Sequence, residues 1–297
     1  MSDPSLLVAI AGENLSAEIN SLGAELHGLR DAQGRDLLWN GDPAFWTGRA
    51  PILFPIVGEV AGGVIRVDGR EYRLARHGFA RRKTWQVVDQ ASDAVTFRIE
   101  ADDETRAVYP FEFRLDLRFA IDAGGLSIAA TLTNPADTPL PASFGFHPAL
   151  RWPLPGGAAR EDHVVRFARP EPAPIRRLDH NGLLSATPEP TPVEGRDLHV
   201  RDAMFEDDAM IFDALESRAV RFGAPGGTTL DVSFPDMPLL GIWTKPGAPY
   251  LCIEPWHGIA DPAGFSGEFR DKPGVIEVAP GGTHVFAIRI DIGAGTL

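Results

Sequence analysis

The sequence has one cysteine, a deficit of basic residues and no long apolar run. Its 297 residues include 28 Lys and Arg against 41 Asp and Glu, a formal net charge of −13, which disfavours partners such as nucleic acid or an anionic membrane surface. A lone Cys252 excludes an internal disulfide, as is usual in a reducing compartment. No stretch approaches the about 20 apolar residues that span a bilayer, and the N-terminus lacks the basic region of a signal peptide. We therefore expect a cytoplasmic protein.

The periodicity of β-strands, by contrast, is abundant. In residues 111–121 every odd position is apolar and nearly every even position is charged, so one face of the strand is expected to be buried. Shorter runs show the same alternation, at 95–99, 126–129, 229–234 and 286–292. The 31 Gly and 26 Pro leave room only for short helices, around 43–46 and 103–108. These patterns predict an all-β protein, a large antiparallel β-sandwich with few short helices.

We expect a single domain over residues 1–297. The segment 169–195 is rich in proline and charge, but strand patterns resume after it in the same style, which favours a surface excursion over a linker. No repeat of fixed period is visible, which argues against a propeller or solenoid. Edge strands cannot be told from central ones in the sequence, so a monomer and a homodimer both remain open.

Three segments interrupt the strand pattern with polar residues beside Gly or Pro; they are 76-RHGFARRKTW-85, 143-SFGFHPAL-150 and 249-PYLCIEPWHGIADPAG-264. Each has an ordinary structural interpretation: His77 in a basic turn, His147 as a satisfied core histidine, and Glu254 as a solvated residue at a strand end. Together the three segments suggest a site for proton transfer, because a histidine and a carboxylate with staggered pKa values can move two protons near neutral pH. The neighbouring aromatic rings suit the C–H face of a sugar.

Candidates for a ring that stacks on a sugar are four tryptophans, Trp46, Trp85, Trp243 and Trp256, of which Trp256 is favoured because it lies next to Glu254 in the chain. Other chemistries have less support. There is no glycine-rich phosphate loop and no GxSxG elbow. A lone cysteine and the absence of H-x-H or HExxH spacing argue against a metal site. We expect neither a metal nor an organic cofactor.

With these segments in view, the chain resembles the aldose 1-epimerase (galactose mutarotase-like) superfamily, and most of all its bacterial branch with HGFAR, GFHP and CIEPW segments. Here these are residues 77–81, 145–148 and 252–256, in the family's order. The resemblance implies a large antiparallel β-sandwich that binds a small-molecule sugar on a concave face. It also implies a reaction without a cofactor, in which the α and β anomers of a free aldose interconvert by acid–base ring opening and closure.

The resemblance also assigns roles to residues. His147 stands where the family has its general acid, and Glu254 where it has its general base. His77 stands where a second histidine bonds the sugar near its ring oxygen. Asp208 matches a carboxylate that binds sugar hydroxyls, with Asp207 as a neighbouring alternative.

One departure concerns the position after 51-PILFPIVG-58, where many relatives carry an arginine and this chain has Glu59. Arg49 is then the candidate to reach the sugar. The neighbouring hexose-6-phosphate epimerases share an HGFAR-like segment and bind phosphate through arginines, a role open here to Arg81 with Arg49 or Arg82. A hexose-6-phosphate 1-epimerase and a non-catalytic carbohydrate-binding or sensing protein therefore remain alternatives to the free-aldose enzyme.

Overall fold

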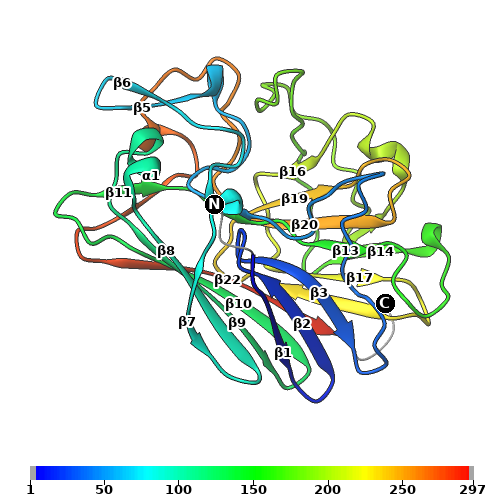
Figure 1. Cartoon of the computed structure of the whole chain (residues 1–297). Helices are drawn as coiled ribbons and strands as arrows, with labels where there is room; N and C mark the ends of the chain where they lie inside the picture. The colour runs from blue at the N-terminus through cyan, green and yellow to red at the C-terminus, as the bar shows by residue number, and fades with distance from the viewer. Residues whose placement is uncertain (1–4, 294–297) are drawn as a thin grey trace.

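Two antiparallel sheets dominate the computed structural model, which describes residues 5–293 (Figure 1). The strands of the nine-stranded sheet, in spatial order, are β15 (Asp197–His199), β14 (Val164–Phe167), β17 (Ala219–Gly223), β18 (Thr229–Ser233), β22 (Thr283–Ile292), β10 (Gly125–Thr133), β9 (Arg114–Asp122), β8 (Ala94–Glu100) and β7 (Gln86–Gln90). Those of the six-stranded sheet are β16 (Met210–Phe212), β19 (Leu239–Trp243), β20 (Tyr250–His257), β12 (Phe144–Phe146) and β4 (Ile52–Leu53), with β13 (Ala149–Arg151) also paired to β20. The predicted all-β class is confirmed.

Smaller elements flank these sheets. A three-stranded sheet, β1 (Leu7–Ala11), β2 (Leu15–Asn20) and β3 (Glu25–Asp31), lies against β8 and β9 (Figure 1). Two-stranded ribbons are formed by β5 (Val64–Val67) with β6 (Arg70–Arg73), and by β11 (Leu140–Ala142) with β21 (Ile276–Val278). The helices are α1 (Asp103–Val108) and five 3₁₀ turns, η1 (Ala61–Gly63), η2 (Ala80–Arg82), η3 (Arg160–Asp162), η4 (Asp202–Phe205) and η5 (Phe269–Asp271). None of the helices in residues 5–293 is long and apolar enough to cross a membrane.

The alternation read from the sequence places the core between the two large sheets. In β9 the apolar positions 115, 117, 119 and 121 are buried, as are the matching positions of β10 and β22. Phe144 of the six-stranded sheet stacks on Phe286 of the nine-stranded one, with ring centroids 4.7 Å apart and planes within 11°. Burial of such apolar surface is the main driving force for the sandwich.

Local details differ from the sequence-based expectations at two places. The strand predicted to begin at residue 111 begins at Arg114, because the Phe111 N–H is taken by the Tyr109 carbonyl in a tight turn after α1. The helix predicted at 103–108 is present and is capped by Asp102, whose side chain accepts the Thr105 N–H. The one predicted at 43–46 is only a turn, closed by a bond from Trp46 N–H to the Asp42 carbonyl.

The 76–85 segment is anchored on β4 by its backbone. His77 and Gly78 both have positive φ, 63° and 69°, and the N–H groups of Phe79 and Ala80 donate to the Phe54 carbonyl. The approach at Gly78 is so close that a Cβ there would lie 2.1 Å from that carbonyl oxygen. Only glycine fits this position.

We predict that Gly78→Ala lowers the free energy of unfolding by about 3 kcal/mol or more, because left-handed backbone strain adds to a clash with Phe54. The matched control is Gly69→Ala, where φ is 75° but no atom lies within 4 Å of the added methyl. It should cost about 1 kcal/mol. Urea unfolding followed by circular dichroism measures both, and equal losses would contradict the packing argument.

Candidate active site

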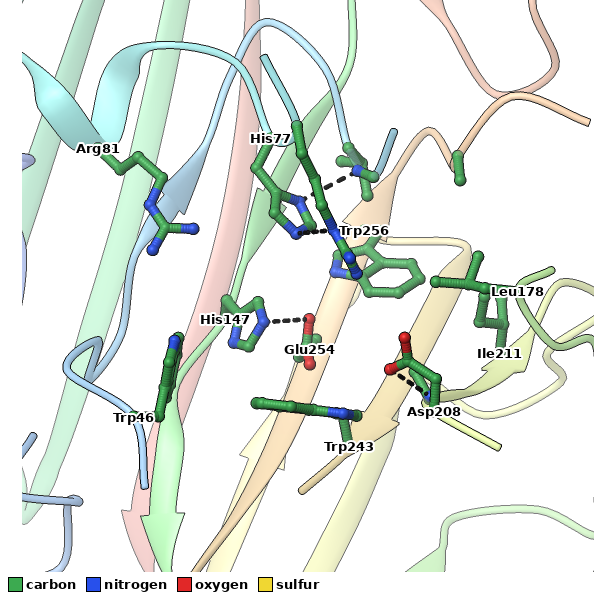
Figure 2. Close-up of a pocket in the computed structure, with 15 residues that line it drawn as sticks. Trp46, His77, Arg81, His147, Leu178, Asp208, Ile211, Trp243, Glu254 and Trp256 are labelled. Atoms are coloured by element: carbon green, nitrogen blue, oxygen red, sulfur yellow. Dashed lines mark hydrogen bonds and ion pairs between the residues drawn. The ribbon is translucent and has the colours of Figure 1, made fainter. Parts of the chain in front are cut away.

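A cavity of about 260 Å³ opens on the face of β20 that points away from the core between the large sheets. Leu251 and Ile253 of this strand enter the core, so the alternate residues, among them Glu254 and Trp256, face the cavity. Its polar wall consists of six side chains, Arg76, His77, Arg81, His147, Asp208 and Glu254, and its apolar wall includes Trp46, Leu178, Ile211, Trp243 and Trp256 (Figure 2). A cavity lined largely by apolar side chains, with a few converging polar groups, is typical of a small-molecule site.

Strand pairing brings His147 to Glu254. On one side of β20, Phe144 and Gly145 of β12 pair with His257 and Trp256, while β13 pairs with residues 250–252. The break between these two short strands therefore lies opposite Glu254, and His147 occupies it. The distance from His147 Nε2 to Glu254 Oε2 is 3.2 Å, and both side chains are buried (Figure 2).

Burial controls the protonation of this pair. It raises the pKa of Glu254 well above its usual value and lowers the pKa of His147 to about 3. The positive charge of Arg81 adds to the lowering at His147, whereas Arg76 partly offsets the rise at Glu254. Between these limits the pair holds a single proton, which either group can carry across the short contact.

His77 is neutral and held by the backbone. Its Nδ1 accepts the buried Gly58 N–H at 3.1 Å, so Nε2 carries the ring proton. The Arg76 Nε lies 3.3 Å from Nε2, but two N–H groups cannot share a hydrogen bond, so we treat this pair as a contact. Burial and the nearby cations lower the pKa of His77 well below its usual value. His77 thus presents an N–H donor beside His147, with ring centroids 6.0 Å apart.

Asp208 and Arg81 line the cavity as the sequence analysis expected of binding residues, and Asp207 does not. Asp208 has a φ of 67°, and its carboxylate accepts the Ala209 N–H at 2.8 Å. Arg81 is largely buried, which lowers the pKa of its guanidinium, and within residues 5–293 it has no ion-pair or hydrogen-bond partner. Both side chains therefore keep free polar atoms that face the cavity (Figure 2).

Arg49 does not line the cavity. Its guanidinium donates to the His27 carbonyl, and its backbone N–H donates to the Glu25 side chain. Both partners belong to β3, so the Arg49 side chain is held against that strand. Arg82 is also outside, where it donates to the Gly78 carbonyl at 2.7 Å. The expectation that either reaches the sugar is not supported by this geometry.

Arg76 lines the cavity and was missed, although it directly precedes His77 in the quoted segment. Glu59, the position at which the resemblance led us to expect an arginine, is not part of the cavity wall. Its charge instead acts on Lys272, which is buried in a 2.9 Å ion pair with Asp261. The guanidinium groups that line the cavity, those of Arg76 and Arg81, both come from the 76–85 segment.

Three of the four candidate tryptophans line the cavity. Trp46 lies beside His147, with ring centroids 5.1 Å apart, and meets Trp243 edge to face. Trp85 is buried in the core, where its Nε1 donates to the Ala80 carbonyl at 3.1 Å. Leu178 and Ile211 were not anticipated, because apolar residues in an irregular excursion and in a short strand carry no distinctive sequence signal.

Within residues 5–293, one group of potential metal ligands stands out at this site. Donor atoms of His147, Cys252 and Glu254 lie within 4.8 Å of one another. The Cys252 thiol is fully buried, and burial together with the charge of Glu254 raises its pKa, so it stays protonated. A metal needs the thiolate, and the arrangement fits proton transfer between His147 and Glu254 better.

Comparison with known proteins identifies the family of the chain. The chain is 30% identical over 285 residues to the chromosomal protein LacX of Lactococcus lactis subsp. lactis, covering 93% of this chain and 95% of that one. It superposes with a TM-score of 0.89 and 27% identity on a galactose mutarotase related enzyme from Lactobacillus acidophilus, over 98% of both chains. A galactose mutarotase-like protein from Lactobacillus casei ATCC 334 gives the same TM-score and identity, over 97% of this chain and 100% of that one. Residues 5–276 match the aldose 1-epimerase family, and the chain belongs to it.

Proposed function

We propose that the protein is an aldose 1-epimerase that interconverts the α and β anomers of a free aldose. The observation that carries the proposal is the 3.2 Å contact between His147 Nε2 and Glu254 Oε2 at the base of a sugar-sized cavity. A protein that only binds sugar does not need a buried acid–base pair. The family membership supports the same class of reaction.

In the proposed mechanism the sugar enters between the two groups and the pair shares one proton throughout. The Glu254 carboxylate takes the proton of the O1 hydroxyl while the His147 imidazolium gives its proton to the ring oxygen O5. The C1–O5 bond breaks, the C1–O1 bond becomes a carbonyl, and the open-chain aldehyde rotates about C1–C2. Reversal of both proton transfers closes the ring on the other face and returns the pair to its starting state. No oxidant, reductant or cofactor is consumed.

The remaining polar groups orient the sugar. The His77 Nε2–H is placed to donate to the ring oxygen or a neighbouring hydroxyl, and the Asp208 carboxylate to accept from hydroxyls further from C1. Trp46 and Trp243 offer ring faces for the apolar side of the sugar. These contacts would hold O1 at Glu254 and O5 at His147, which is the geometry that proton transfer requires.

Glu254→Gln and His147→Asn should each slow mutarotation by about 10²–10⁴-fold, because each removes one positioned proton-transfer group. Optical rotation of freshly dissolved α-glucose and α-galactose measures the rate, after subtraction of the spontaneous reaction. Glu13→Gln and His199→Asn, both exposed and outside the cavity, are matched controls that should keep the wild-type rate. Tryptophan fluorescence reports sugar binding independently, so binding without turnover in the wild type would favour the non-catalytic alternative.

The pH dependence follows from the two shifted groups. Near pH 3 the His147 ring takes up a proton, and the pair then holds two protons and has no base. Above the raised pKa of Glu254 the last proton leaves, and no acid remains for O5. We expect a bell-shaped kcat/KM profile with its acid limb near pH 3 and its alkaline limb well above the ordinary carboxyl range of about 4.3. An acid limb near the usual histidine value of about 6.5 would contradict the assignment.

A hexose-6-phosphate epimerase is the second candidate, and it is favoured by one observation: Arg81 lines the cavity without an ion-pair partner within residues 5–293. On this candidate kcat/KM is higher for a hexose 6-phosphate than for the free hexose. Arg81→Ala then raises KM for the phosphate about 10–100-fold, the value of a charge-assisted hydrogen bond, and leaves KM for free hexose nearly unchanged. Arg70→Ala, an exposed arginine on β6, is the control. Preference for the free sugar rejects this candidate.

A further inference from the structure

The structure points to a second role in the same site, and it rests on the proposed function: we propose that Trp256 is a positioning residue whose indole N–H holds Glu254 in the ionised form that acts as the base. The expectation from sequence was a platform for stacking. Only 5% of Trp256 is exposed, however, which leaves little ring surface for a sugar. Trp46 and Trp243 are less buried and better placed for that purpose.

Two glycines, Gly145 and Gly241, form the surface on which the Trp256 indole ring lies, which we call its seat. Gly145 of β12 pairs with Trp256, and Gly241 of β19 pairs with Glu254. A Cβ at Gly241 would lie 2.4 Å from Trp256 Cζ2 and Cη2, and one at Gly145 would lie 2.7 Å from Cδ1. The ring therefore lies flat across the backbone of both neighbouring strands. Neither glycine has a positive φ. Glycine is needed at these positions because a side chain would clash with the indole, and not because of the backbone conformation.

This seat directs the indole N–H to the base. Trp256 and Glu254 are two residues apart on β20 and project from the same face. The ring reaches over Gly241, the residue opposite Glu254, and Figure 2 shows its nitrogen end as the part of the ring nearest to Glu254. Nε1 is fully buried and has no partner within strict hydrogen-bond geometry in the described residues. Its N–H nevertheless lowers the pKa of the Glu254 carboxyl. A buried donor without another partner is satisfied when that carboxylate is ionised.

Other groups act on Glu254 from the surrounding elements. Arg76 and Arg81 of the 76–85 segment favour its ionised form, and Asp208 opposes it. His147 contacts it directly, and Cys252 and Tyr250 lie on the same strand. The arginines and Asp208 act through their charges across a cavity that opens to solvent, so added salt weakens their effect more than it weakens a direct contact. The indole is neutral and in contact, and its effect should persist at high ionic strength.

The test begins with Trp256→Phe, which keeps an aromatic ring and removes the N–H. Without that donor the ionised form of Glu254 is less stable, so the alkaline limb of the kcat/KM profile should move up by about one pH unit. The productive state, with carboxylate and imidazolium, is then less populated, and the plateau rate should fall about tenfold. Both changes should persist in 0.5 M salt. A lower rate with an unmoved alkaline limb would show a structural role only and overturn the proposal.

A second measurement does not need turnover. The chain has six tryptophans, and labelling with ¹⁵N gives one indole N–H signal for each, of which Trp256→Phe identifies one by its loss. We expect that signal to titrate over the range of the alkaline limb in the wild type and to stay constant in Glu254→Gln, with the other indoles as internal references. A signal unaffected by Glu254→Gln overturns the proposal. If the wild type turns over no sugar, the proposed function fails. The titration still shows whether the Trp256 N–H contacts the Glu254 carboxylate.

Gly241→Ala provides an independent variant in case Trp256→Phe does not fold. Its methyl group occupies the space of the indole while every functional group is retained. Displacement of the ring should reproduce the shift of the alkaline limb and remove the titration of the Trp256 signal. An unmoved limb together with an unchanged Trp256 titration would contradict the proposed seat.

Discussion

The site depends on how β20 is paired. On one side the strand is hydrogen bonded to β19 from Leu239 to Trp243 without interruption. On the other side its partners are two short strands, β12 and β13, with a break between them. The register of pairing is the same before and after the break, so His147 stands directly opposite Glu254. The break covers residues 147 and 148, where the strand is interrupted and the His147 side chain lines the cavity. The rigid sheet on either side then fixes a distance that loops alone would hold less well.

The second constraint is electrostatic. A carboxylate and an imidazole buried together favour the state with neutral groups, because each charge loses its hydration. The proton transfer proposed for this site requires the charged state to be energetically accessible. The cavity meets this requirement with groups that stabilise a negative Glu254: Arg76, Arg81 and the Trp256 N–H. The pair is thus uncharged in the sugar-free site, and these groups lower the energy of the charged state that the proposed mechanism uses.

The cavity wall is built from segments that lie far apart in the chain. A glutamate at position 59 joins a buried charge network with Lys272 and Asp261, which braces the segment that follows β20. The positive charge of the wall is provided by Arg76 and Arg81, both from the 76–85 segment. The excursion at 169–195 closes another side with Leu178, and the Arg177 side chain ties it to the Asp208 carbonyl at 2.9 Å. A surface excursion is therefore part of the cavity wall.

The sequence by itself determined the strand class, most strand positions, α1 and the identity of the acid–base candidates, because two-residue periodicity and short motifs are local properties of the chain. The motif residues His77, Arg81, His147, Asp208 and Glu254 all reach one cavity. Only the tertiary structure decided that Arg76 lines this cavity and Arg49 does not, that Leu178 and Ile211 complete it, and that Trp256 lies flat on Gly145 and Gly241. These outcomes depend on strand register and on which backbone carbonyl accepts a hydrogen bond from a given side chain. Both are set by contacts between residues distant in the chain.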